Sequence, residues 1–84
     1  MKSSTFKKVI REICTDVIKY SEAYNFEVAS DRLAQLSNCI EDFANEASFL
    51  QVPLILWATC KYSQVYRYMS KLLELKMIKE RRGN

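Results

Sequence analysis

One glycine and one proline in 84 residues constrain the fold of this chain more than any other feature of its sequence. Tight turns, bulges and sheet corners depend on these two residue types, so a chain with so few of them has little means of changing direction. Hydrophobic residues make up 49% of the sequence, enough to give long helices a buried face. The composition therefore predicts an all-α fold, and the length predicts a single domain over residues 1–84.

Hydrophobic periodicity predicts two helices in the first half of the chain. Apolar residues recur at spacings of three and four over about residues 5–24, and Ser3 or Ser4 is available as the N-cap. A second helix is expected over about residues 26–50. Asn25 lies at the break between them, where asparagine tolerates left-handed geometry at the end of one helix and caps the next. Residues 1–50 are thus interpreted as a two-helix platform.

Two shorter helices are expected in the second half, which makes a small bundle of about four helices. Pro53 ends the second helix and can occupy the first turn of the next, because proline lacks a backbone donor and restricts the residue before it. Residues 53–60 are apolar on nearly every side, as in a short buried helix. Ser63 is a good N-cap for a last helix over about residues 63–76, which leads into a basic tail. Residues 53–84 therefore form a candidate helix-turn-helix segment.

The second predicted helix carries a heptad-like seam of apolar residues. The seam runs through Ala29, Leu33, Leu36, Ile40, Phe43, Ala47 and Leu50, at alternating steps of four and three. Such a seam packs along another helix at a shallow angle. Packing against the first helix of the same chain is the simpler interpretation, and a homodimer formed through the Ala29–Leu50 seam is the alternative.

The positive charge is concentrated at one end of the chain. Residues 1–60 carry a net charge of −2, whereas the last 24 residues carry +5. This asymmetry favours a polyanionic partner, although a solvated helix face followed by a basic tail would have the same composition.

The sequence offers no group of residues typical of a catalytic or metal site. It contains no histidine and no glycine-rich loop, and its three cysteines, Cys14, Cys39 and Cys60, lie far apart. We therefore expect no enzymatic activity, no metal and no cofactor. No signal peptide is recognisable, and the longest uncharged stretch, 47–60, is too short to cross a bilayer. We expect a soluble cytoplasmic protein with no integral membrane association.

The last predicted helix has two distinct faces. Four apolar residues are expected to point inward, namely Val65, Met69, Leu72 and Leu73. The outward face would carry Gln64, Arg67, Ser70, Lys71 and Glu74. Arginine and glutamine side chains recognise guanine and adenine edges, and lysine and serine contact the phosphate backbone.

This segment resembles the recognition helix of winged helix-turn-helix DNA-binding domains. The resemblance rests on Ser63-x-Val65-x-Arg67-x-Met69-x-Lys71-Leu72-x-Glu74-x-x-Met77-Ile78, followed by Lys79-x-Arg81. It implies a support helix at 54–59 and a turn at 60–62. It also implies that DNA is the partner, with three residues facing the major groove and three contacting phosphates; these are Gln64, Arg67 and Lys71 for the groove, and Lys61, Arg81 and Arg82 for the phosphates.

The resemblance covers about residues 54–84 and includes no second wing strand. Three interpretations stay open: a lost wing, a fragment of a longer winged-helix protein, or one long helix over 64–80 in an ordinary bundle. We therefore carry two functional hypotheses. The first is a small DNA-binding regulatory protein that contacts DNA through its C-terminal basic helix. The alternative is a non-enzymatic protein-binding module, such as an inhibitor, adaptor or immunity-type protein, that docks on a larger partner.

Overall fold

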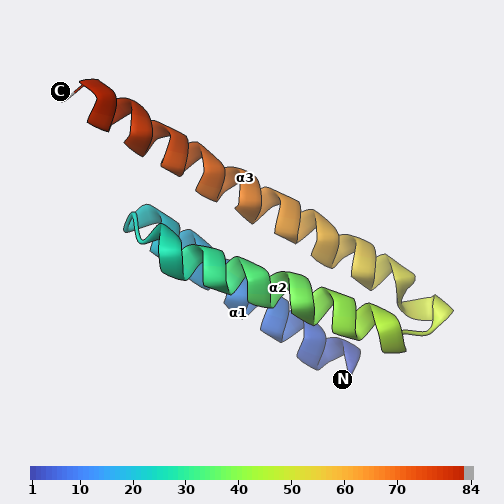
Figure 1. The fold of residues 1–84 in the computed structure, drawn as a ribbon. Helices are drawn as coiled ribbons and strands as arrows, with labels where there is room; N and C mark the ends of the chain where they lie inside the picture. The colour runs from blue at the N-terminus through green and yellow to red at the C-terminus, as the bar shows by residue number, and fades with distance from the viewer. Residues whose placement is uncertain (83–84) are drawn as a thin grey trace.

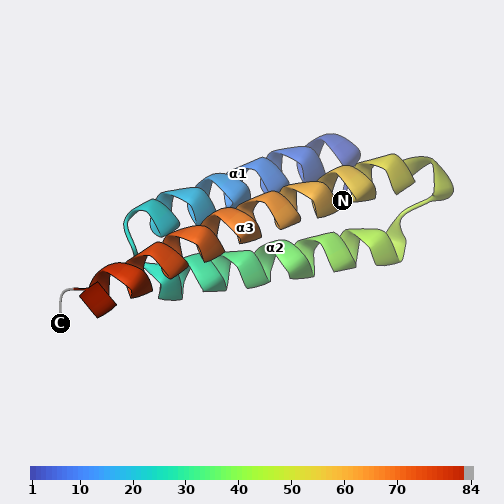
Figure 2. The ribbon, with the colours of Figure 1, turned by 90° about the horizontal axis from the view of Figure 1, so that it is seen from above.

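The computed structural model describes residues 1–82 and consists of three long helices. These are α1 (Ser3–Glu22), α2 (Phe26–Glu46) and α3 (Val52–Arg82), with a short 3₁₀ helix, η1 (Phe49–Gln51), immediately before α3. The described residues contain no strand, which confirms the all-α prediction. α1 and α2 form an antiparallel hairpin, and α3 runs back along both of them (Figures 1 and 2). The result is a rod of 54 × 16 × 15 Å.

The prediction of four helices was wrong, because the two expected at 53–60 and 63–76 are one helix. α3 continues through Cys60–Tyr62, where a turn was expected. Neither glycine nor proline interrupts this stretch, and a serine inside a helix costs only about 0.5 kcal/mol relative to alanine. The inward-facing residues Ala58, Val65 and Met69 keep one helical phase across the junction, so packing favours an uninterrupted helix.

The core runs along the axis of the rod and draws on all three helices. Phe6 and Ile10 of α1 and Leu36 of α2 are fully buried, and Val65 of α3 packs into the same cluster. The rings of Phe6 and Phe43 stack with their centroids 3.9 Å apart. Stacked aromatic rings add to the free energy gained from burying their surface. This pair joins the beginning of α1 to the end of α2.

The connection between α1 and α2 depends on one left-handed residue. Tyr24 has a φ of 57°, and the backbone N–H of Asn25 donates to the carbonyl of Tyr20 at 2.8 Å. This is the hydrogen-bonding pattern of a Schellman helix end. Asn25 itself caps α2, because its side-chain oxygen accepts from the N–H of Val28. The break and the cap at Asn25 are confirmed, but the left-handed residue is its neighbour.

The connection between α2 and α3 is organised by Gln51. Its side-chain oxygen accepts from the backbone N–H of Ser48 at 2.9 Å, and its Nε2 donates to the hydroxyl of Ser3 at 3.1 Å. The corner is thereby tied to the start of α1. Ser3 lies inside α1 and does not cap it, because the N-cap is Lys2, which makes no side-chain capping bond. The predicted Ser3 or Ser4 cap was wrong.

The apolar seam of α2 is used within the chain. Its first members, Ala29, Leu33 and Leu36, are buried against the other helices, and Phe43 stacks on Phe6. Leu50 is 86% exposed, because α2 ends at Glu46 and the chain has already turned. Most of the seam therefore packs within the chain, as the simpler of the two interpretations predicted. A homodimer through the Ala29–Leu50 seam stays a prediction, although four of its seven residues are already buried within the chain.

α3 is longer than the two helices that support it. It has 31 residues, against 20 in α1 and 21 in α2. At 1.5 Å per residue the difference is about 15 Å. The ammonium group of Lys76 lies 5.7 Å from the ring centroid of Phe26, at the start of α2. Beyond this contact α3 extends past the α1–α2 connection (Figure 1).

Candidate functional site

Three of the predicted DNA-contacting residues lie together on the outward side of α3. Gln64, Arg67 and Lys71 are all exposed, and their spacing of three and four places them on one helix face. Lys71 forms an ion pair with Glu74 at 3.9 Å, in which both side chains are largely exposed. An exposed pair of this kind holds its partners weakly, so Lys71 remains accessible to another ligand.

The other three predicted residues are not part of this group. Lys61 is half-buried on the α1 side of α3, where its charge acts on Cys14. Arg81 and Arg82 lie in the last turn of α3, which is about 15 Å beyond Lys71 at the helical rise. The six residues therefore do not form one continuous patch. No corner at Cys60–Tyr62 presents them to a groove, and nothing in residues 1–82 identifies a winged helix-turn-helix domain.

The inward face of α3 agrees with the prediction, with one exception. Val65 and Met69 are buried and Leu72 is half-buried, but Leu73 is 37% exposed. The hydroxyl of Ser30 donates to the sulfur of Met69 at 3.9 Å, which links α3 to α2. The exception arises because Leu73 lies about 100° around the helix from Leu72 and so leaves the buried arc.

Tyr68 ties α3 to the end of α1. Its hydroxyl donates to a carboxylate oxygen of Glu22 at 3.1 Å. This hydrogen bond, together with partial burial and the carboxylate charge, raises the pKa of Tyr68 above its ordinary value. The phenol therefore stays protonated at physiological pH, and it serves as a structural contact.

The feature that the sequence interpretation missed is the amount of exposed apolar surface in the second half of the chain. Phe49 and Leu50 at the η1 corner are 88% and 86% exposed, and Leu56 on α3 is 61% exposed. Several more large apolar side chains follow on α3, namely Tyr66, Leu73, Leu75, Met77 and Ile78. Exposed apolar side chains that gather on one face mark interaction sites, and these residues lie on more than one side of α3. The sequence did contain a signal for this exposure, because several apolar residues of α3 do not fall on the helix face that points into the core.

The helices also differ in net charge. α2 carries a net charge of −4, whereas α3 carries +5. Since α2 and α3 lie side by side, one flank of the rod is acidic and another is basic (Figure 2). Docking on α3 would therefore be favoured for a partner that has an acidic rim.

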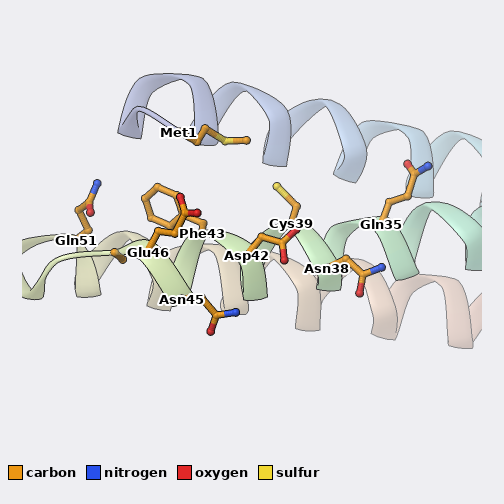
Figure 3. Close-up of a pocket in the computed structure, with 10 residues that line it drawn as sticks. Met1, Gln35, Asn38, Cys39, Asp42, Phe43, Asn45, Glu46 and Gln51 are labelled. Carbon is orange, nitrogen blue, oxygen red and sulfur yellow. The ribbon is translucent and has the colours of Figure 1, made fainter.

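A hollow of about 610 Å³ is lined mainly by the second half of α2, together with Met1 and Gln51. Cys39 and Phe43 point from α2 toward α1, whereas Asn38 and Asn45 point away (Figure 3). Burial raises the pKa of the Cys39 thiol, and the charge of Asp42 raises it further. A thiol with a raised pKa is a poor nucleophile at neutral pH. The hollow is lined by polar side chains that can form hydrogen bonds with a ligand, but its cysteine is not an activated nucleophile.

Residues 1–82 contain no candidate for a metal site or for a membrane-spanning helix. No cluster of three or more cysteine, aspartate or glutamate side chains is arranged to hold a metal ion there. Along the same residues, none of the helices combines the length and the apolar character needed to cross a bilayer. No protein-family model, curated protein or solved structure matches this chain.

Proposed function

We propose that this chain is a helical protein-interaction module, which acts by binding a larger protein through the distal end of α3 (residues 75–82). One observation carries the proposal. Ile78 is exposed on the part of α3 that follows the contact of Lys76 with Phe26, and Leu75 is exposed one turn before it. This end of α3 extends past the α1–α2 connection (Figure 1). Exposing two large apolar side chains costs free energy that burial against a partner would recover.

The distal end also indicates the chemistry of the partner. Lys79, Arg81 and Arg82 surround the two apolar residues, while Lys76 is held by Glu80 at 3.9 Å. An amphipathic helix typically docks by placing apolar anchors in a groove of the partner. We infer that the partner offers an apolar groove with carboxylates along its rim.

Replacing Ile78 with glutamate should weaken capture of this partner at least about tenfold, because an apolar anchor at an interface is worth about 1.4 kcal/mol or more. The chain, tagged at its N-terminus, is used to capture its partner from native cells, and the dissociation constant is then measured with the purified partner. The matched control is Ile18→Glu on α1, because Ile18 is 37% exposed and Ile78 is 40% exposed. Equal affinities for the two variants would contradict the proposal.

A second candidate function is DNA binding, as the sequence suggested. It is favoured by the outward face of Gln64, Arg67 and Lys71 and by the charge of +5 on α3. Without a helix-turn-helix corner, α3 would lie with its side against the duplex, and contacts to phosphates would dominate. Regulation would then follow from occupancy of the DNA.

The charge-reversed variant Arg67→Glu/Lys71→Glu separates the two candidates. If DNA is the ligand, the variant should lose at least about tenfold in affinity for duplex DNA, and wild-type binding should fall steeply as salt rises. A gel-shift titration at low and moderate salt measures both effects. If the distal end binds a protein, this variant should lose less affinity for the partner than Ile78→Glu does, because Arg67 and Lys71 lie before the two apolar anchors. Absence of DNA binding at tens of micromolar protein in low salt would rule out the second candidate.

A further inference from the structure

A second surface of α3, on the side that borders α2, is distinct from both the distal anchors and the Gln64 face. It consists of positions that alternate in steps of four and three along the helix, and we call it the outer stripe. All of its members are exposed or half-buried: Val52, Leu56, Thr59, Ser63, Tyr66, Ser70, Leu73 and Met77. This spacing is the heptad pattern by which one helix packs along another.

The outer stripe is free of charge. None of its eight residues is ionisable at neutral pH, although α3 contains nine lysine, arginine and glutamate residues. A solvated helix face would be expected to hold a share of these charges. Depletion of charge is typical of the centre of a protein interface.

The stripe is complementary to itself in the antiparallel direction. If a second copy of α3 runs the opposite way, with Leu56 opposite Leu73, then Val52 faces Met77 at each end. In the middle, Thr59 faces Ser70 and Ser63 faces Tyr66. Apolar residues thereby meet apolar residues at both ends of the stripe, and hydroxyl-bearing residues meet one another in the middle. An interface between identical copies related by a two-fold axis requires this kind of self-complementarity.

The available area agrees with a stable dimer once α2 is included. The stripe is about 39 Å long, so a single helix width of about 10 Å offers about 400 Å² per copy. A groove of about 260 Å³ joins Thr59 and Tyr62 to Ser37, Ile40 and Glu41 of α2, so both helices form one surface. A face two helices wide covers about 700–800 Å² per copy. Stable interfaces bury about 800 Å² per partner.

We propose that the outer stripe binds a second copy of this chain, giving an antiparallel homodimer whose two-fold axis passes at the level of Gln64 and Val65. The dimer leaves Leu75 and Ile78 outside the interface, because both lie on the other side of α3. It also leaves both Gln64 faces accessible. The inference is therefore independent of the partner proposed for the distal end.

A charge-compensation cycle tests the arrangement directly. Leu56→Lys and Leu73→Glu should each raise the dimer dissociation constant at least about 100-fold, since each places two unpaired charges in the interface. The double variant Leu56→Lys/Leu73→Glu should recover most of the loss, because every lysine then faces a glutamate of the other copy. Sedimentation velocity over a concentration series gives the constants, and circular dichroism confirms that the variants fold. A parallel dimer would show no recovery.

Disulfide trapping provides a second readout that does not depend on affinity. In a Cys60→Ser background, Thr59→Cys/Ser70→Cys should give covalent dimers in which position 59 of one copy is linked to position 70 of the other. The two positions lie about 16 Å apart on one helix, so they cannot pair within a chain. Mass spectrometry of the digested dimer identifies the link.

Three results would overturn the proposal. They are a wild-type chain that remains monomeric at hundreds of micromolar, a compensation cycle without recovery, and links of position 59 to 59 or of 70 to 70. Failure of the Ile78→Glu experiment would leave this proposal intact, because Ile78 lies outside the stripe. Conversely, Leu56→Lys should still capture the partner of the distal end.

Discussion

Replacing Phe6 with alanine should lower the free energy of unfolding by about 3–5 kcal/mol, the range observed for buried aromatic residues. Phe6 is fully buried, and its ring stacks on Phe43 at 3.9 Å, so the substitution removes the contact that joins α1 to the end of α2. A chain of this length is expected to have about 4–12 kcal/mol of stability in total. The variant should therefore be close to unfolded at physiological temperature. Urea denaturation followed by circular dichroism measures the loss.

Phe49 provides the matched control for this experiment. The same chemical change, Phe49→Ala, removes a ring that is 88% exposed at the η1 corner and should alter stability by no more than about 0.5 kcal/mol. A loss of similar size in the two variants would mean that the core does not lie where the structure places it.

Replacing Cys60 with proline should destabilise the chain by about 3 kcal/mol or more. Cys60 is exposed, so its side chain contributes little to the core, and the cost arises from the backbone. Proline removes one hydrogen bond of the helix and its ring clashes with the carbonyl one turn earlier. The prediction is specific to the continuous α3, because a turn at Cys60–Tyr62 would accept proline at much lower cost. Thermal unfolding reports the difference.

Arg81→Pro is the control for the backbone effect. It introduces the same ring into the last turn of α3, beyond the contact of Lys76 with Phe26, where few interactions depend on the helix. We expect a change of less than about 1 kcal/mol, as for other frayed helix ends. If Cys60→Pro were as mild as Arg81→Pro, the middle of α3 would not be a packed helix.

The first two helices could be predicted from the sequence because their signals are local. The spacing of apolar residues fixes the inward faces of α1 and α2, and Asn25 provides a cap whose hydrogen bond reaches only to Val28. The left-handed residue was harder to place. Asparagine is the usual choice for that geometry, but here Tyr24 adopts it, held by the hydrogen bond from Asn25 to Tyr20.

The number of helices could not be predicted, because Ser63 carries the same local signal at a helix start and inside a helix. Whether its hydroxyl caps a new helix depends on the backbone of the preceding residues, and packing decides that. Val65 and Met69 continue the phase of Ala58, and burying all three along one line stabilises the straight form. The resemblance to a recognition helix implied a corner at Cys60–Tyr62, and α3 has no corner there.

The candidate interaction surfaces were only partly accessible to sequence reasoning. The outward position of Gln64, Arg67 and Lys71 followed from helical spacing alone and is confirmed by their exposure. The exposure of Leu75 and Ile78 did not follow, because it depends on where α1 and α2 end relative to α3. The outer stripe was missed for a related reason, since an expected break at Cys60–Tyr62 divided it between two helices.

The central claim is that α3 is one uninterrupted helix and not two helices joined at a corner. Amide hydrogen exchange measured residue by residue along α3 tests it most directly. We predict continuous protection from about Leu56 through Ser63 to Leu72, falling only in the distal end beyond Lys76. Rapid exchange confined to Cys60–Tyr62, with protected residues on both sides, would contradict it.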